Sequence, residues 1–232
     1  LLIAALRTVI QLGLIGLVLE ALFAAERLLW VVLMALAMLL IAGREVMARQ
    51  KRRLGGGWAF GIGTLAMFLS SFTVTVLVLT VIIGPDPWYR PQYAIPLLGM
   101  LLGNTMTGVA LALDRLTDSA WRQRAVIENR LMLGQPWQVA IGDIRREAMR
   151  SGLMPMINAM AAAGVVSLPG MMTGQILAGT APGLAVKYQI LIMFAITLGT
   201  GFGTLAAVAA GSRRLFDSRE RLRLDRLVAP RR

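Results

Sequence analysis

The stretch WAFGIGTLAMFLSSFTVTVLVLTVII, from Trp58 to Ile83, contains 26 residues and no charged side chain. A helix rises about 1.5 Å per residue, so about 20 apolar residues are enough to cross the hydrocarbon layer of a membrane, which is about 30 Å thick. This stretch is therefore long enough to span a membrane with some tilt. It predicts that the chain is a helical membrane protein.

Similar apolar runs recur along the chain, which has 232 residues, is 57% hydrophobic and has a mean hydropathy of +0.69. They predict an all-α, polytopic transmembrane bundle that forms a single domain over residues 1–232. We expect six membrane-spanning helices, at residues 1–22, 28–42, 58–83, 93–113, 153–168 and 185–210. The second is short unless it runs on through residues 45–47.

Basic residues are gathered in three segments of the chain. Of the 24 lysines and arginines, 20 lie in residues 44–53, 114–150 and 213–232, against 12 acidic residues in the whole chain. Two expected spans separate each segment from the next, so all three lie on one side, which the positive-inside rule assigns to the cytoplasm. Topology and attraction to lipid headgroups explain this charge without nucleic acid. We expect a multi-pass protein of the plasma membrane, or of a bacterial inner membrane, with a basic cytoplasmic tail at 213–232.

The chain contains no histidine and no cysteine. This excludes thiolate and imidazole metal sites, disulfides, and nucleophiles activated by a histidine base. The GxxxxGK[ST] phosphate-binding loop is also missing from the sequence, so any ATP and Mg²⁺ are expected on a separate chain. We therefore expect no enzyme activity and no bound cofactor in this chain, and the role of a conduit.

The polar segment 114–150 predicts a helical hairpin outside the membrane. Gly134 is suited to end its first helix and Pro136 to begin the second. Apolar residues recur at helical spacing on both sides of this turn: Leu116, Ala120, Ile127, Leu131, Trp137, Ala140, Ile141, Ile144 and Ala148. These stripes have to be buried, and the sequence leaves two candidates, the lipid surface and a partner protein.

The same segment resembles the EAA loop in permease subunits of ABC transporters. Glu128, Gly134 and Ile144 have the spacing of that loop, although Asn129 and Arg130 replace its two alanines and its later Leu-Pro pair is missing. In that family the loop forms a coupling helix that docks into a groove of the ATPase subunit. The resemblance implies ATPase coupling by Glu128, Gly134, Trp137, Ile141 and Ile144.

A longer resemblance covers nearly the whole chain. The blocks LRTVIQL, LGMLLGNTMTGVALALDRL, IENRLMLG, VSLPGMMTGQILAG and AVKYQILIMF resemble, in the same order, the signature blocks of the FetB family of iron-export ABC permeases. Plant aluminium-tolerance membrane proteins are similar to this family. The resemblance implies a permease that works with a separate cytoplasmic ATPase and exports a metal from the cytosol, with iron as the leading candidate. It also implies a homodimer and a further helix before residue 1.

Polar residues inside the expected spans are candidates for the substrate pathway, because buried polar groups are expensive in lipid and face the bundle interior. We place Asn104, Thr105 and Asn158 on this pathway. Hydrogen bonding between packed helices is the alternative, and small residues in the fourth span favour it: Gly99, Gly103 and Thr107.

The stretch VVSLPGMMTGQILAGTAP, residues 165–182, predicts that the fifth helix ends or kinks at Leu168. The residues expected to break it are Pro169, Gly170 and Gly174. Carbonyl groups freed at such a break can bind cations, so we place an outer gate here. Four further donors join the expected pathway, with apolar packing and helix capping as their alternative roles: Met171, Met172, Thr173 and Gln175. The residues that would coordinate a metal stay unidentified.

Two other functions fit the same sequence. The chain could be an ABC permease for a non-metal solute, such as a nucleotide sugar, a lipid or a peptide. It could also be a membrane scaffold without transport. Association with an ATPase separates both permease functions from the scaffold.

Overall fold

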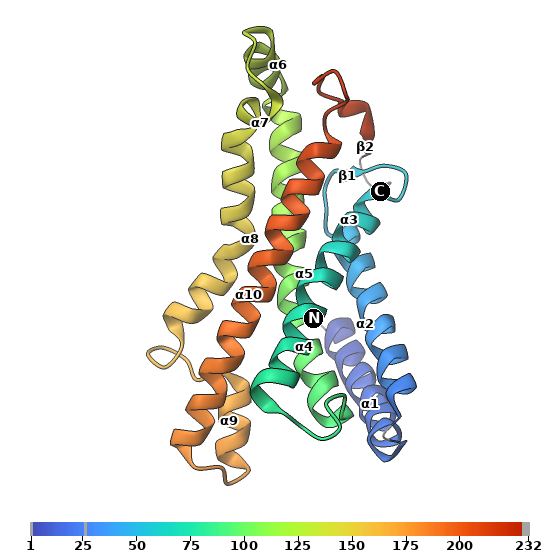
Figure 1. Cartoon of the computed structure of the whole chain (residues 1–232), viewed down its shortest axis with the longest axis vertical. Helices are drawn as coiled ribbons and strands as arrows, with labels where there is room; N and C mark the ends of the chain where they lie inside the picture. Colours follow the sequence, from blue (N-terminus) through green and yellow to red (C-terminus); the bar gives the residue numbers. More distant parts are fainter. Residues whose placement is uncertain (1, 26, 229–232) are drawn as a thin grey trace.

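The computed structural model describes residues 2–25 and 27–228, and helices form almost all of its regular structure (Figure 1). Within these residues, five helical spans are long and apolar enough to cross a membrane, which confirms the expected all-α polytopic bundle. They are Ala5–Ala24, Leu28–Ala48, Trp58–Ile83, Pro91–Arg122 and Pro182–Arg214. Six spans were expected, and the expected fifth span is the one that does not meet this criterion of length and composition in the described residues.

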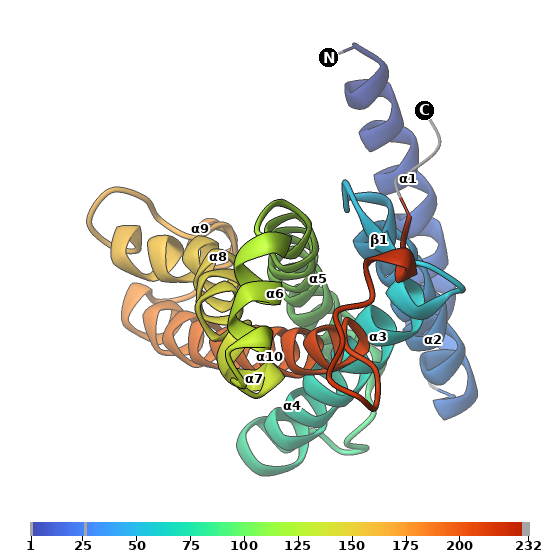
Figure 2. The ribbon, with the colours of Figure 1, turned by 90° about the horizontal axis from the view of Figure 1, so that it is seen from above.

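Helix α1 (Leu2–Ala25) extends away from the other helices, as the view from above shows (Figure 2). Most of its described side chains are exposed, among them Val9 and Leu17, while Leu22 near its end is buried against the bundle. A helix with so much apolar surface is stable in lipid, because its backbone hydrogen bonds are satisfied within the helix.

Helix α2 (Leu28–Ala48) runs on past the expected end at Ala42. The added turns carry the exposed Arg44 and Glu45 on one side and the fully buried Val46 on the other. Gly43 brings this part of α2 close to the third crossing, because a Cβ placed on it would lie only 2.0 Å from the Thr64 hydroxyl. The helix is thus longer because its last turns still have a neighbour to pack against.

The third crossing is continuous over Trp58–Ile83, as expected, but it is not α-helical throughout. Helix α3 (Trp58–Met67) is followed by the π-helical η1 (Phe68–Phe72), by α4 (Thr73–Leu77) and by a second π-helical segment, η2 (Val78–Ile83). In η1 the buried Ser70 hydroxyl donates a hydrogen bond of 2.8 Å to the carbonyl of Ala66. The apolar pattern of the sequence does not distinguish these wider turns from α-helix.

Helices α5 (Pro91–Arg122) and α10 (Pro182–Arg214) are the longest, with 32 and 33 residues. A proline begins each of them at the first helical position, where its missing N–H is not needed. At 1.5 Å per residue each helix is about 50 Å long, well beyond the hydrocarbon layer of about 30 Å. Both therefore continue past the expected ends, at residues 113 and 210, into the basic segments.

The expected fifth span, at residues 153–168, is wrong. Helix α8 (Gly142–Ala162) begins earlier, in charged sequence, and also ends earlier. It ends because Ala163 is extended and Gly164 has a φ of +79°, a left-handed conformation that stops a helix. The short helix α9 (Gly170–Leu177) then continues toward the end of the bundle where α10 begins (Figure 1).

Small residues bring α5, α8 and α10 into close contact at the centre of the bundle. A Cβ placed on Gly108 would lie 3.0 Å from the carbonyl oxygen of Gly152 and 2.7 Å from the Thr200 methyl group. A Cβ on Gly203 would lie 2.5 Å from the methyl group of Thr105. This packing surface of α5 therefore contains Thr105 and Gly108.

The expected packing residues of α5 lie elsewhere on the helix. Gly99 approaches the side chain of Met38, at 3.2 Å from an added Cβ, but Gly103 is exposed and its added Cβ would meet no described atom within 4 Å. Within the described part of the chain, the predicted packing at Gly103 therefore has no neighbour. Two sets of small residues occur in this helix, and spacing alone does not say which one faces the bundle.

All three basic segments lie at one end of the bundle, which we call the basic end (residues 44–53, 114–150 and 213–228; top of Figure 1). It contains α6 (Arg124–Met132), α7 (Trp137–Ala140), η3 (Leu224–Arg226) and the strands β1 (Arg53–Leu54) and β2 (Leu227–Val228). The two strands pair antiparallel, with Arg53 opposite Val228. That this end faces the cytoplasm stays a prediction.

Candidate functional site

A helical hairpin made of α6, α7 and the start of α8 forms the outermost part of the basic end (Figure 1). Its apolar stripes, expected to need lipid or a partner, are buried within the chain: Leu116, Ala120, Ile127, Ala140, Ile141, Ile144 and Ala148. They belong to the same apolar cluster as Leu215 and Phe216, which follow α10. The C-terminal segment thus supplies cover that sequence reasoning assigned to other molecules. The signal that could have revealed it is this apolar pair within a basic tail.

The turn of the hairpin is its most exposed part. Gly134 has a φ of +80°, and its N–H donates a hydrogen bond of 3.0 Å to the Leu131 carbonyl, so α6 ends here as a glycine-terminated helix. Just before it, Met132 and Leu133 are 78% and 81% exposed. Adjacent apolar side chains so exposed outside the membrane-spanning helices are typical of a protein-binding surface.

The residues predicted to couple to an ATPase fall into two groups. Glu128 and Gly134 are exposed near the turn, whereas Ile141 and Ile144 are buried at the base of the hairpin. The two isoleucines therefore hold the hairpin to the bundle, and Trp137 lies half-buried between the groups. The exposed Met132 and Leu133 were missed because they do not belong to either apolar stripe.

Arg130 ties the two arms of the hairpin together. Its guanidinium donates a hydrogen bond of 3.2 Å to the Ala140 carbonyl and forms an ion pair of 2.9 Å with Asp143, at the start of α8. The EAA loop that this segment resembles has an alanine at this position. The arginine therefore adds a connection between the arms that an alanine cannot make.

Trp137 connects the hairpin to the C-terminal tail. Its ring lies 5.3 Å from that of Phe216, and its backbone N–H donates a hydrogen bond of 3.2 Å to the Glu220 carboxylate. A displacement of α7 would therefore act directly on the tail through these contacts.

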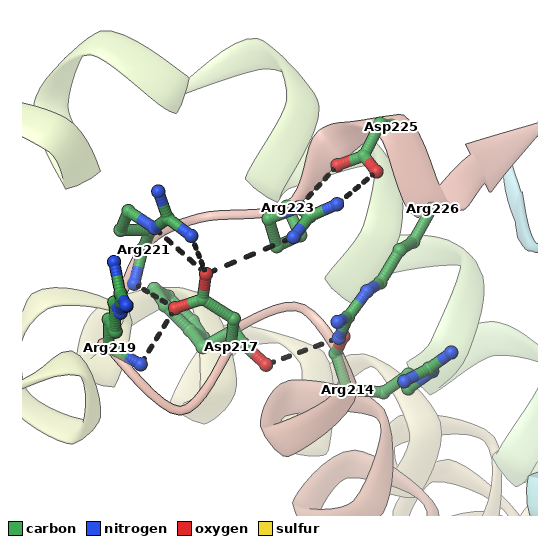
Figure 3. Close-up of polar contacts among 8 residues, drawn as sticks. Arg214, Asp217, Arg219, Arg221, Arg223, Asp225 and Arg226 are labelled. Carbon is green, nitrogen blue, oxygen red and sulfur yellow. Dashed lines mark hydrogen bonds and ion pairs between the residues drawn. The ribbon is translucent and has the colours of Figure 1, made fainter.

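Asp217 organises this tail (Figure 3). Its carboxylate accepts hydrogen bonds from the backbone N–H groups of Arg219 and Arg221, both at 2.9 Å, and pairs with the side chains of Arg221 and Arg223 at 2.9 and 3.9 Å. These contacts, with the backbone hydrogen bond from Arg221 first, hold the pKa of Asp217 below its ordinary value. Arg223 also binds Asp225 through two hydrogen bonds, which lowers the pKa of Asp225 to about 2.

The tail reaches the loop between α2 and α3 as well. Arg226 donates hydrogen bonds of 2.8 and 3.3 Å to the carbonyls of Arg214 and Phe216, and its own carbonyl accepts one of 2.8 Å from Gly55. Pairing of β1 with β2 continues this contact. The tail therefore links the hairpin and the end of α10 to the start of α3.

A polar groove of about 700 Å³ lies between α5 and α8. Its lining residues are Leu111 on α5 and, on α8, Glu147, Arg150, Ser151, Met154, Pro155 and Asn158. Glu147 forms a hydrogen-bonded ion pair with Arg115 of α5, so this pair bounds the groove toward the basic end.

Asn104 and Asn158 lie farther from the basic end than this ion pair. Asn104 stands eleven residues before Arg115 on α5, and Asn158 stands eleven residues after Glu147 on α8. Eleven residues are about three helical turns, so each amide lies on the same face of its helix as the ion-pair partner. Both asparagines are exposed. Asn158 lines the groove, whereas Asn104 is not among its lining residues. We call the side of α5 and α8 that carries the ion pair and the two asparagines the polar seam.

Thr105, also predicted on the pathway, lies away from that seam. It is fully buried, and its hydroxyl oxygen accepts a hydrogen bond of 3.3 Å from the Ser71 hydroxyl on η1. Neighbouring residues on a helix differ by about 100° in direction, which separates Thr105 from Asn104. Thr105 therefore lies in the core, whereas Asn104 lies on the polar seam.

The remaining predicted residues lie on α9, which does not contribute to the described lining of the polar groove. Met172 is buried, Met171 packs against an apolar cluster, and the Thr173 hydroxyl donates a hydrogen bond of 3.2 Å to the Pro169 carbonyl. The Gln175 side-chain oxygen is buried, with no hydrogen-bond partner among the described residues.

Residues expected to break the fifth helix mark the beginning of α9 instead of the end of α8. Pro169 is the residue before α9, Gly170 is its first residue, and Gly174 lies within it. The non-helical stretch is 163–169, so the actual stop at Gly164 lies four residues before Leu168.

Comparison with known proteins gives this architecture a family. Residues 1–216 match the model of "Uncharacterised protein family (UPF0014)". The chain belongs to the UPF0014 family. The match ends at Phe216, so it includes the bundle, the hairpin and the apolar pair that covers it. None of the solved structures matches the chain.

Relatives of this UPF0014 chain come from bacteria and plants. A UPF0014 membrane protein of Synechocystis sp. is 40% identical over 93% of this chain and 83% of its own length. "Probable iron export permease protein FetB" of Escherichia coli is 31% identical over 95% of this chain and 83% of its own length. "Protein ALUMINUM SENSITIVE 3" of Arabidopsis thaliana is 32% identical over 88% of this chain and 71% of its own length. These relatives confirm the resemblance seen in the sequence blocks.

Proposed function

We propose that this UPF0014 chain is the membrane permease subunit of an ABC-type transporter, driven by ATP and Mg²⁺ bound to a separate ATPase subunit. The observation that carries the proposal is the hairpin. It joins α5 to α8, exposes Met132 and Leu133 at its turn, and buries its base in the bundle. An ATPase that binds the turn would therefore hold both helices that border the polar groove.

The proposed coupling works through rigid connections. Ile141 and Ile144 fix the hairpin to the bundle. Helix α8 continues from Glu147 to Asn158 and contains Pro155 between them. A helix transmits a displacement at one end to side chains several turns away. Closure of the ATPase subunits is thereby converted into movement at the polar groove.

The groove itself is proposed as one wall of the pathway. Exposed Asn104, Asn158 and the Arg115–Glu147 pair are costly surfaces to present to lipid. A second copy of the chain, related by two-fold symmetry, would cover them and supply the opposite wall. This is the physical reason for a homodimeric permease, with the basic end in the cytoplasm and lipid around the remaining surface.

Iron, or another metal, is the proposed cargo, and export the proposed direction. The support is the similarity to the relative named an iron export permease and the oxygen and sulfur donors in the groove, from Glu147, Ser151, Met154 and Asn158. Among the described residues, three or more carboxylates do not come together as a metal-binding group. Scattered donors of this kind suit brief contacts during passage better than tight storage of an ion.

Reconstitution tests the proposal. The full chain and the ATPase that copurifies with it are placed in vesicles, and ATP-driven flux of Fe²⁺, Cu⁺, Zn²⁺ and Mn²⁺ is measured. We expect flux of iron that needs both subunits, and at least a severalfold loss in Asn158→Leu. The control is Val166→Leu, which changes an exposed residue outside the groove and should keep full flux.

Each other outcome points to a different function. ATPase activity stimulated by a nucleotide sugar, a lipid or a peptide, without metal flux, would replace the metal by an organic solute. Failure of any ATPase to copurify would leave the scaffold function and overturn the permease proposal.

A further inference from the structure

A second cavity lies at the basic end, away from the groove between α5 and α8. Its volume is about 890 Å³, and it is enclosed by the start of α3, the end of α10, the tail and Trp137. Trp58 and Ile62 form its side on α3, and Ala210 and Arg213 line it from α10. It therefore lies where two membrane-spanning helices leave the apolar layer.

Arginines dominate the lining of this cavity, with Asp217 and Glu220 as its acidic members: Arg213, Arg214, Arg221, Arg223 and Arg226. Arg221 and Arg223 are paired with carboxylates of the tail. The other three lack a carboxylate partner within ion-pair distance in the described part of the chain.

Two of these three arginines contact uncharged groups instead of carboxylates. Arg214 lies over the ring of Trp58, 4.3 Å from its centroid, and Arg226 binds carbonyl oxygens at the end of α10 (Figure 3). Neither contact neutralises a guanidinium. The lining thus holds five arginines and two carboxylates, an excess of positive charge.

An apolar groove continues from this cavity along the same two helices. Its volume is about 530 Å³, and its lining runs from Ala66 to Ile82 on the third crossing and from Ala206 back to Leu191 on α10. Ile62, in the basic cavity, stands one turn before Ala66, and Ala210 stands one turn after Ala206. The seam between the third crossing (α3 to η2) and α10 therefore changes from a basic cavity into an apolar groove within one turn.

A ligand that fits both parts must carry an anionic group at one end and a long apolar chain at the other. Membrane phospholipids have this chemistry, and basic pockets between helices at the cytoplasmic side bind their anionic headgroups. Trp58 supports this position, because tryptophan is enriched at the level of the headgroups. The groove from Ala66 to Ile82 is about 24 Å long, more than the 15 Å or so of apolar depth in one leaflet.

We propose that the seam between the third crossing and α10 binds one anionic glycerophospholipid, with its phosphate against Arg213, Arg214 and Arg226 and an acyl chain in the apolar groove. The lipid neutralises the charge that the tail leaves unpaired. It also joins α3, α10 and the tail, and through Trp137 it stabilises the hairpin. This site does not depend on which solute the protein carries.

The test measures retained lipid on the purified full chain by native mass spectrometry, after delipidation and addition of phosphatidylglycerol or phosphatidylcholine. We expect one phosphatidylglycerol per chain and little phosphatidylcholine. The double variant Arg213→Gln, Arg214→Gln should lose about tenfold or more of this binding. The matched control, Arg44→Gln with Arg124→Gln, removes two exposed arginines of the basic end that do not line the cavity, and should bind like the parent.

A second variant tests the acyl chain separately. Ala206→Phe fills the apolar groove and leaves every arginine in place, so it should also reduce phosphatidylglycerol binding, whereas Ala209→Phe, exposed on α10 outside the described lining, should not. Unchanged elution and helical circular dichroism show that the variants are folded.

Three results would overturn the proposal. Equal retention of both lipids would show an annular lipid without recognition of charge. Displacement of phosphatidylglycerol by millimolar inorganic phosphate, with no effect of Ala206→Phe, would show a site for free phosphate. Loss of ATPase copurification in the arginine variant, with lipid binding intact, would show a protein-docking surface.

Discussion

The carbonyl oxygen of Gly108 lies 2.6 Å from the point where a Cβ of Gly152 would stand, so α5 and α8 touch through their backbones. This contact lies between the hairpin and the deeper asparagines of the polar seam. Because the obstacle is backbone and not the end of a flexible side chain, neither helix can make room without shifting. The two helices that the hairpin joins are therefore also fixed to each other inside the bundle.

Gly152→Val should destabilise the protein by about 1–3 kcal/mol, the usual range for overpacking a core. The melting temperature of the purified protein in detergent is the measurement. Gly103→Ala is the matched control, because an added Cβ there meets nothing and alanine is the better helix former by about 1 kcal/mol. A Gly152→Val protein as stable as the parent would show that α5 and α8 do not pack as described.

The double variant Met132→Ser, Leu133→Ser should abolish copurification of the ATPase without lowering stability. Both side chains are exposed at the turn of the hairpin, so their loss removes apolar surface from a partner and not from the core. Pull-down of the ATPase and the melting temperature are measured together. Val165→Ser with Val166→Ser, equally exposed but away from the basic end, is the control. Normal ATPase capture by the hairpin variant would place the contact elsewhere.

Gly134→Val should weaken the coupling of ATP hydrolysis to transport. Its backbone φ of +80° is strained for a β-branched residue, at about 1–2 kcal/mol, so the turn must change shape. Asparagine tolerates this conformation, and Gly134→Asn should retain most of the activity. The readout is metal-stimulated ATPase activity of the assembled complex. Undiminished stimulation with Gly134→Val in an intact complex would refute a role for the shape of this turn.

Uncharged length predicted the membrane spans well where a helix is apolar throughout, as at Trp58–Ile83. It did not predict α8, because this helix begins in charged sequence and its end depends on the backbone of Gly164. The extension of α5 and α10 into the basic segments was missed for a related reason, since hydropathy reports where lipid ends and not where a helix ends. Where these helices begin and end therefore depends on backbone conformation and packing, which hydropathy does not report.

The candidate site was predictable only in parts. Periodicity found the buried stripes of the hairpin, but the residues that cover them, Leu215 and Phe216, are distant in sequence. The polar residues Asn104 and Asn158 were recognised because they interrupt apolar sequence, whereas the ion pair of Arg115 with Glu147 joins two helices whose register the sequence does not reveal. Contacts across such distances need the fold.

The tail should stay attached to the basic end between pH 8 and about 5 and detach as the pH falls from about 4 toward 2. The pKa of Asp225 is lowered from 3.8 to about 2 in the folded protein, and that of Asp217 is also lowered. A carboxylate whose pKa is lower in the folded state stabilises that state at any pH above the pKa of the unfolded chain. This contribution is lost as the pH falls and the carboxylate becomes protonated. Hydrogen exchange of residues 217–228, corrected for its intrinsic pH dependence, measures the change.

Neutral variants of these carboxylates separate this effect from general acid unfolding. Asp217→Asn should release the tail at pH 8, where trypsin would cleave it faster after Arg219 and Arg221. Asp118→Asn breaks an ion pair with Arg122 on α5 and should leave tail cleavage unchanged. A tail that is equally resistant in Asp217→Asn would mean that β1–β2 pairing alone holds it.

Arg115→Glu and Glu147→Arg should each reduce metal flux severalfold, and the two together should restore much of it. Each single change places two like charges opposite each other across the end of the groove, which pushes α5 and α8 apart, whereas the exchange recreates the pair. Because both side chains are nearly half exposed, with 47% and 43% of their surface accessible, the effect on stability should stay below about 1 kcal/mol. Flux and melting temperature are therefore measured side by side.

Restored flux in the exchanged variant would show that attraction between α5 and α8, and not the chemistry of either residue, serves transport. Loss of flux in Glu147→Arg and in the exchanged variant, with flux kept in Arg115→Glu, would instead assign Glu147 a direct contact with the cargo.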